Sequence, residues 1–376
     1  MFSRRTFLLG VITILAVALG QVAGQTASSK SGTPAPSKKG TPAPPTPGLP
    51  TVFVLATGGT IAGAAESDTQ SGYSSGQVGV EQLLEAVPQA KKLANMKGEQ
   101  VSNIGSQDMN DEVWLKLARR VNEIVAMPDI SGIVITHGTD TIEETAFFLN
   151  LVVKSRKPVV LTASMRPSTA LSADGPLNFY NAVAVAADKD AAGRGVLVVI
   201  NDWIHGASSL TKTSTTAVQT FLSPLTGLMG VVAYGKTDWF RGPVGPHTMD
   251  SEFSLDGITT LPRVDIVMAY ENMDGALIDC AAGAGAKGIV VAGVGNGNLT
   301  APAVKALAAQ AKAGIVCVRS SRVATGNVGR NVELEDDKLG FVASKDLNPQ
   351  KARVLLRLAL TKTKDVKQIQ RYFDQY

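Results

Sequence analysis

Residues 52–63, VFVLATGGTIAG, are the most informative segment of this chain. Its apolar first half is typical of a buried strand, and the pair Gly58 and Gly59 breaks that strand into a turn. Glycine tolerates positive φ and lets the backbone come close to a ligand. Thr60 then lies at the carboxyl end of the strand, where ligands bind in α/β sheets. The stretch therefore predicts a strand that ends at a site.

Taken alone, this turn permits two other interpretations, an ordinary strand-to-helix turn or a glycine loop that binds phosphate. A second segment favours the site. Residues 132–141, GIVITHGTDT, repeat the design, with an apolar strand that runs into polar residues and a helix-like segment that follows directly. Two strand ends of the same kind indicate one shared crevice.

The polar end of the second segment contains residues that can start a helix and, just before them, two residues with no role in starting it. Thr141 and Glu144 have the T-x-x-E spacing of a capping box. Thr139 and Asp140 come just before it and are left without a structural role. An acid beside a hydroxyl at the end of a strand is a candidate for a catalytic or binding site.

Apolar strands alternate with amphipathic segments such as residues 112–127, which predicts a largely parallel sheet with helices on both faces. A hairpin is expected at residues 230–242, around Gly235. The expected strands are residues 52–56, 132–136, 158–163, 195–201, 264–269, 288–292 and 315–318.

The chain of 376 residues is long enough for two domains, and its 44% hydrophobic and 18% charged residues are typical of a globular protein. Residues 243–262 lack a long apolar run and contain Pro243 and Pro246, so the linker is expected there. The larger domain is then residues 51–242, and the smaller one residues 263–376.

The N-terminus is predicted to be an export signal. Residues 1–24 contain the twin-arginine-like pattern SRRTFLL, an apolar run at 7–19 that is short for a membrane span, and small residues for cleavage. A periplasmic or secreted protein follows, without stable membrane insertion after the signal is removed. The Sec route and an uncleaved anchor are the alternatives. Residues 25–50 are Pro-rich and predict an extended tether.

The charge of the chain gives no indication of a nucleic-acid partner. The formal charge is +4, from 36 basic and 32 acidic residues, but residues 1–49 hold five of the basic residues and none of the acidic ones. The remainder has 31 basic and 32 acidic residues. No cluster of lysine and arginine interleaved with aromatic residues is present in the sequence.

The two threonine motifs resemble the signatures of the bacterial L-asparaginases and glutaminase-asparaginases in their periplasmic type II form. The resemblance covers nearly all of the chain after residue 50 and continues through residues 98–111, 163–176, 210–216, 293–298, 319–323 and 347–356. It implies a larger flavodoxin-like α/β domain with a mainly parallel sheet, and a smaller α/β C-terminal domain. It also implies an amidohydrolase that converts L-asparagine to L-aspartate and ammonia, with lesser hydrolysis of L-glutamine. A dual glutaminase-asparaginase is the alternative.

Deamidation needs a nucleophile, a base and donors for the oxyanion. The resemblance assigns Thr60 as the primary nucleophile, activated by Tyr73 from a small, polar loop that is expected to act as a lid. It assigns Lys212 as the third member of a set with Thr139 and Asp140, and a lysine can serve as base when burial lowers its pKa. Water then resolves an acyl-enzyme. Which threonine attacks in each half-reaction stays open.

The three histidines do not supply an obvious Ser-His-Asp set. His205 and His247 are expected in polar loops, and His137 at the strand end is expected to orient the backbone.

Substrate recognition requires groups for an α-carboxylate and an α-ammonium group. By resemblance, Gly59, Ser106, Gln107 and Thr139 line the substrate site, and Asp140 accepts a hydrogen bond from the ammonium. The alternative for Ser106 and Gln107 is a simple turn, with residues 108–110 capping the next helix. Glutaminase-leaning relatives often have glutamate after this serine, so Gln107 favours asparagine.

The resemblance further implies that a neighbouring subunit completes each site through Asn298 and Glu333, in a homotetramer built as a dimer of dimers. The sequence around Glu333 departs from the family pattern. No cofactor is implied, and no His/Cys cluster has the spacing of metal ligands. Cys280 and Cys317 are expected to be two buried thiols, with a disulfide between them as the alternative.

Two functions of other classes fit parts of the sequence. A periplasmic amino-acid-binding protein would share the export signal and the two-domain organisation, but it would not need Thr60, Tyr73, Thr139 and Lys212 together. A nucleotide-binding oxidoreductase would use the TGGT turn for phosphate, but the turn lacks a full G-x-G-x-x-G and an acid at the expected spacing.

Overall fold

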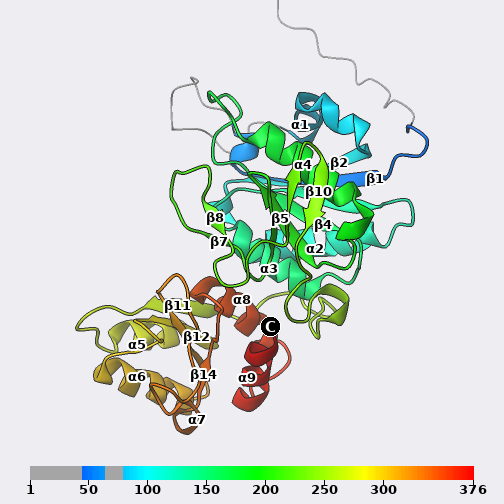
Figure 1. Cartoon of the computed structure of the whole chain (residues 1–376). Helices are drawn as coiled ribbons and strands as arrows, with labels where there is room; N and C mark the ends of the chain where they lie inside the picture. Colours follow the sequence, from blue (N-terminus) through cyan, green and yellow to red (C-terminus); the bar gives the residue numbers. More distant parts are fainter. Residues whose placement is uncertain (1–44, 64–78) are drawn as a thin grey trace, which may run out of the picture. The chain divides into compact units, whose positions relative to one another are not determined.

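The computed structural model describes residues 45–63 and 79–376, and within them it has two main sheets and a two-stranded ribbon (Figure 1). The larger sheet has eight strands in the order β10-β9-β6-β5-β4-β3-β1-β2, and the smaller has four in the order β11-β12-β13-β14. The predicted α/β class, with a larger mostly parallel part and a smaller one, is confirmed. The expected export signal, the tether and Tyr73 lie outside the described residues.

The larger sheet is parallel from the edge strand β2 through β1, β3 and β4 to β5, and antiparallel from β5 through β6 and β9 to β10. The pairing of β9 with β10 confirms the predicted hairpin around Gly235. Its strands are β1 (Thr51–Gly58), β2 (Asn95–Ile104), β3 (Gly132–Thr136), β4 (Val159–Thr162), β5 (Val196–Ile200), β6 (Trp203–Gly206), β9 (Gly230–Ala233) and β10 (Lys236–Trp239).

Helices cover both faces of this sheet, so its central strands β3, β4 and β5 are buried at every position. Phe53 and Leu55 of β1 belong to the hydrophobic cluster that contains α2 and α3, whereas Val52 and Val54 belong to the cluster with α1 and α4. The helices are α1 (Val80–Ala86), α2 (Asp111–Val125), α3 (Ile142–Val152) and α4 (Gly175–Ala187).

The smaller sheet is parallel throughout. It is formed by β11 (Val264–Met268), β12 (Gly288–Gly293), β13 (Val316–Ser321) and β14 (Phe341–Ala343), with helices α5 (Ala276–Gly283), α6 (Ala301–Lys312), α7 (Asp336–Leu339), α8 (Pro349–Leu360) and α9 (Val366–Gln375). The remaining elements are the two-stranded ribbon of β7 (Thr211–Lys212) and β8 (Phe221–Leu222), and the 3-10 helices η1 (Thr60–Ala62), η2 (Pro88–Lys92), η3 (Ser106–Asp108), η4 (Lys189–Ala191) and η5 (Thr248–Asp250).

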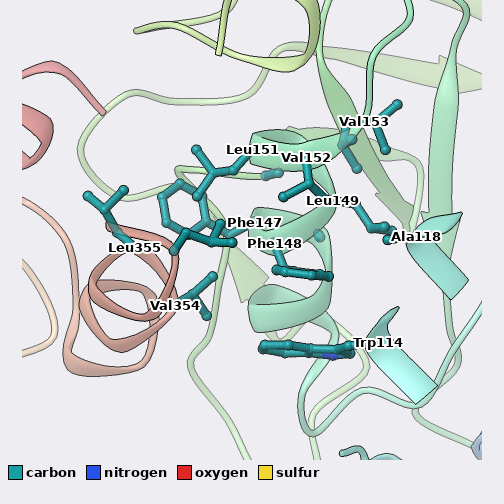
Figure 2. Close-up of a cluster of buried hydrophobic side chains, with 14 of the residues drawn as sticks. Trp114, Ala118, Phe147, Phe148, Leu149, Leu151, Val152, Val153, Val354 and Leu355 are labelled. Atoms are coloured by element: carbon teal, nitrogen blue, oxygen red, sulfur yellow. The ribbon is translucent and has the colours of Figure 1, made fainter. Parts of the chain in front are cut away.

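Helix α8 joins the two parts of the chain through a shared core. Figure 2 shows Val354 and Leu355 of α8 beside Phe147 of α3, within a buried cluster that also contains Trp114. The same cluster includes Val290 from the smaller sheet. Movement of α8 would therefore disturb the packing of α3 against the larger sheet.

The two cysteines are free thiols in the structure, and the prediction that both are buried is wrong for Cys280. Cys317 is fully buried on β13, and burial raises the pKa of its thiol to about 12. Cys280 is exposed because α5 buries only Ile278 and Ala281. Across the described residues, no helix is long and apolar enough to span a membrane.

A buried ion pair organises the loops of the smaller part. Arg319 and Asp336 are both fully buried and form two hydrogen bonds, at 2.5 Å from Nε and 2.7 Å from Nη2. Arg319 also donates to the carbonyl oxygens of Gly297 and Gly329. The guanidinium thus connects two loops that are far apart in sequence.

We expect Arg319→Met to lower the free energy of unfolding by about 3–5 kcal/mol, because the Asp336 carboxylate would stay buried without its partner. The matched control is Lys97→Met, which breaks the exposed pair with Asp129 at 2.8 Å and should leave the free energy of unfolding nearly unchanged. Urea unfolding of both variants measures the difference. Equal losses would contradict the structural role of the buried pair.

Candidate active site

Three parallel strands end at one edge of the larger sheet and bring the predicted site segments together. Strand β1 lies between β2 and β3, with Ala56 opposite Thr136 and Gly58 opposite Ile104. The amide of Gly59 donates to the carbonyl oxygen of Ile104 at 3.0 Å. The turn that holds Thr60 therefore lies against the loops that follow β2 and β3.

These loops touch through their backbones because glycine stands at the contacts. A Cβ built on Gly59 would lie 2.4 Å from the amide nitrogen of Gly138, and one on Gly138 would lie 2.5 Å from Oγ of Ser106. Gly59 also has a φ of 81°, which side chains rarely adopt. A larger residue at Gly59 would force the backbone at Gly138 to move, and one at Gly138 would displace the side chain of Ser106.

Lys212, Thr139 and Asp140 meet as the sequence predicted. Nζ of Lys212, on β7, donates to Oγ1 of Thr139 at 2.9 Å and to Oδ1 of Asp140 at 2.7 Å. The Asp140 side chain is 54% exposed, so the ion pair contributes little to stability. Thr139 is buried. The arrangement joins a hydroxyl, an amine and a carboxylate that remains accessible from solvent.

The predicted capping box at Thr141 and Glu144 is wrong. Thr141 precedes α3 but makes no side-chain cap, and its hydroxyl instead donates to the carbonyl oxygen of Ser106 at 2.7 Å. Glu144 faces Arg353 of α8, with 3.9 Å between Oε2 and Nη1. Thr141 and Glu144 thus contact Ser106 and Arg353, which are distant in sequence, and they do not make the local hydrogen bonds of a capping box. This contact of Thr141 has no signal in the sequence.

Ser106 and Gln107 lie on η3, so the turn that the sequence allowed is present together with the proposed site residues. Ser106 is buried, and its hydroxyl accepts a hydrogen bond from the amide of Asp140 at 3.1 Å. Gln107 is exposed. Asn110 caps α2 by accepting from the amide of Val113 at 3.1 Å, which is the cap that the alternative interpretation placed at residues 108–110. The loop after β2 is thereby held at both ends.

The two threonines of the TGGT turn differ in their surroundings. The hydroxyl of Thr57 donates to the carbonyl oxygen of Thr136 at 2.9 Å and so connects β1 to β3. Thr60 is buried at the start of η1, beyond the end of the strand. Thr57 therefore has a structural task, and Thr60 is the threonine that stands at the edge of the sheet.

The histidines are buried and neutral. His137 approaches the carbonyl oxygen of Gly138 at 2.8 Å through Nδ1 and Oγ1 of Thr145 at 3.0 Å through Nε2, and burial lowers its pKa to about 4. These contacts suit the expected role in orienting the backbone. The expectation of a polar loop is wrong for His205, which lies fully buried on β6 with its pKa lowered to about 3 by burial. His247 is buried at the start of η5.

Asn298 and Glu333 belong to the smaller part of the chain. Asn298 closes a tight turn with Val294 through backbone bonds of 2.7 and 3.0 Å, and Glu333 is exposed just before α7. Among residues 45–63 and 79–376, no hydrogen bond or ion pair joins either of them to Thr139, Asp140 or Lys212. The structure of one chain thus brings together only part of the predicted site.

No metal centre accompanies this site in the part of the chain that the structure describes, because no three His, Cys, Asp or Glu side chains gather there in a way that could hold an ion.

Comparisons with known proteins match both parts of the chain. Residues 51–245 match the family described as "Asparaginase, N-terminal", and residues 263–373 match "Glutaminase/Asparaginase C-terminal domain". The chain is 56% identical over 328 residues to the probable periplasmic L-asparaginase of Haemophilus influenzae, covering 87% of this chain and 93% of that protein. It is 51% identical to the glutaminase-asparaginase of Pseudomonas fluorescens biotype A, covering 87% and 91%.

The fold is also similar to a solved structure. The crystal structure of a probable cytoplasmic L-asparaginase from Campylobacter jejuni has a TM-score of 0.85 and 47% sequence identity, covering 87% of this chain and 100% of that one.

Burial of His137 predicts a dependence of stability on pH. Its pKa falls from 6.5 to about 4 on folding, so between these values the unfolded chain binds a proton that the folded chain does not. The stability of the fold is therefore unaffected by the titration of His137 above its unfolded pKa of 6.5. As the pH falls toward its folded pKa of about 4, the free energy of unfolding decreases by on the order of 3 kcal/mol.

Urea unfolding of the wild type and of His137→Asn, at about pH 7 and about pH 5, tests this expectation. Other groups titrate in both proteins, so the comparison isolates His137. The variant should lose less stability than the wild type over this interval, whatever its stability at neutral pH. An identical loss would show that His137 does not titrate as its burial implies.

Proposed function

The chain belongs to the asparaginase family and is an asparaginase, and we propose that it hydrolyses L-asparagine to L-aspartate and ammonia through a threonine nucleophile, with lesser hydrolysis of L-glutamine. The observation that carries the mechanism is the bond of 2.9 Å from Nζ of Lys212 to Oγ1 of Thr139, at the sheet edge that also holds Thr60. A proton-transfer group beside a buried hydroxyl is what amide hydrolysis requires.

In the proposed first half-reaction, Oγ1 of Thr60 attacks the side-chain amide carbon, and Tyr73 relays the hydroxyl proton of Thr60 to the amide nitrogen. The C–N bond then breaks and ammonia leaves with that proton, so that an acyl-enzyme ester remains on Thr60. In the second half-reaction, Thr139, Lys212 and Asp140 transfer protons while water attacks the ester. Aspartate is released, and the hydroxyl of Thr60 is restored.

Recognition of the substrate is assigned to the loops around the glycine contact. The exposed carboxylate of Asp140 suits the α-ammonium group. Ser106 accepts from the amide of Asp140, which leaves its hydroxyl hydrogen to donate to the α-carboxylate. Gln107, an exposed residue of η3, supports a preference for asparagine, because glutaminase-leaning relatives often have glutamate after this serine. A dual glutaminase-asparaginase is the alternative, since relatives with both names are similar to this chain.

We further propose that Asn298 and Glu333 act on the site of a neighbouring subunit in a homotetramer. Their location in the smaller part of the chain, without a bond to Thr139, Asp140 or Lys212 in the described residues, supports this assignment. Residues 243–262 are proposed as the linker between a catalytic domain at 51–242 and a C-terminal domain at 263–376. Residues 1–24 are proposed to direct export, which agrees with the periplasmic relative from Haemophilus influenzae.

An amino-acid-binding protein is the alternative from another class. It would need Asp140, Ser106 and Gln107, but it would gain nothing from an amine placed against the hydroxyl of Thr139. Release of ammonia separates the two functions.

We expect Thr60→Ala to lower kcat for L-asparagine by about three orders of magnitude or more, because the nucleophile is removed. Lys212→Met should lower it by about 10²–10⁴-fold through the loss of proton transfer. The matched control is Thr57→Val in the same turn, which removes only the bond to Thr136 and should cost about 1 kcal/mol of stability with kcat preserved.

The measurement is ammonia release from L-asparagine and L-glutamine at matched concentrations, with each variant checked for folding. Faster turnover of asparagine than glutamine supports the proposed preference. An active Thr60→Ala variant would refute the assigned nucleophile, and a folded wild type that releases no ammonia would leave only a binding site.

A further inference from the structure

Lys351 is a buried cation at the junction of the two parts of the chain. It lies in the first turn of α8, where the side chain of Asn348 accepts from its amide at 3.0 Å, and its own side chain is 4% exposed. Nζ donates to the carbonyl oxygen of Leu210, in the larger part, and lies 4.0 Å from Oε2 of Glu143. A lysine of the C-terminal region is therefore held among residues that precede and follow the catalytic loops.

Burial of this ammonium group carries a cost, because a charge that leaves water must find compensation. Burial lowers the pKa of Lys351, and the nearby carboxylates of Glu143, Asp346 and Glu144 oppose that shift. In the described residues, Oε2 of Glu143 is buried without a hydrogen-bond partner, so its charge depends on the ammonium. The attraction between two buried charges is largely offset by the cost of removing them from water, so the net stabilisation by this pair is small. A buried pair of this kind can instead serve to hold two segments in a fixed arrangement.

The two residues that Lys351 contacts are close in sequence to the proposed proton-transfer residues. Leu210 comes two residues before Lys212, and β7, which carries Lys212, has only two residues paired with β8. Glu143 lies in the first turn of α3, three residues after Asp140. One ammonium group thus contacts the segment that presents Lys212 and the helix that follows Thr139 and Asp140.

We propose that Lys351 is a positioning residue that holds β7 at the distance from α3 at which Nζ of Lys212 reaches Oγ1 of Thr139. Lys351 acts through the Leu210 carbonyl and Glu143, and it does not touch the substrate. The inference rests on the proposed function, since it takes Lys212 and Thr139 as catalytic. It implies that the C-terminal part of the chain contributes to catalysis in its own subunit.

The test compares kcat and KM for L-asparagine with urea unfolding in the full-length assembled protein. Lys351→Met should lower kcat by about 10–100-fold, because a misplacement of about 1 Å is enough to do so. KM should stay within about threefold, since the groups that bind the ground state are unchanged. The variant should also unfold at lower urea, because Glu143 is left buried and unpaired.

A double variant, Lys351→Met with Glu143→Leu, separates positioning from stability. It removes the unpaired charge, so stability should recover, whereas the Leu210 carbonyl still lacks its donor and kcat should stay low. Recovery of kcat together with stability would overturn the proposal. A Lys351→Met variant with wild-type kcat would overturn it as well.

Two controls complete the experiment. Arg353→Met breaks another ion pair of α8, at 3.9 Å from Glu144, and should leave kcat unchanged, because Arg353 holds neither β7 nor Leu210. Equal losses of kcat in the Arg353 and Lys351 variants would overturn the specific role of Lys351. A fully active Lys212→Met variant would refute both the catalytic role proposed for Lys212 and the positioning role of Lys351. An inactive Lys212 variant beside a normal Lys351 variant would refute the positioning role alone.

Discussion

The backbone contact between Gly59 and Gly138 is the constraint on which the rest of the site depends. It brings the turn after β1 against the loop after β3, and Ser106 from the loop after β2 packs onto Gly138. Thr60, Ser106 and Thr139 are close in space because no Cβ separates their loops. Parallel strands make this possible, since their carboxyl ends meet at the same edge of the sheet.

Lys212 reaches that edge from outside the parallel sheet. Its strand, β7, is short, so its place depends on tertiary contacts, and one of these comes from α8 through Lys351 and the Leu210 carbonyl. Helix α8 in turn packs on α3 within the shared core, as Figure 2 shows. The chemistry proposed for the larger part of the chain is therefore supported mechanically by the smaller part.

Burial assigns different tasks to the polar residues around the site. His137 and His205 are held neutral by their apolar surroundings, so they suit structural hydrogen bonds better than proton transfer near neutral pH. Thr139 is buried but contacts Lys212, while Asp140 keeps much of its carboxylate in water. The proposed catalytic groups are thus the ones that lie where the buried sheet edge meets solvent.

The central strands, the glycine turns and the hairpin around Gly235 could be predicted from the sequence, and a cap at residues 108–110 was one of the alternatives it allowed, because apolar runs and local backbone preferences are set by neighbours along the chain. The meeting of Thr139, Asp140 and Lys212 was predicted only through the family resemblance, because spacing alone would have left Lys212 as a surface lysine. The sequence did not reveal the half-exposed edge strand β2, the exposure of Cys280, or the bond from Thr141 to Ser106 that replaced a capping box. Only the tertiary structure decided these, because packing brings in hydrogen-bond partners and solvent contacts from segments distant in sequence.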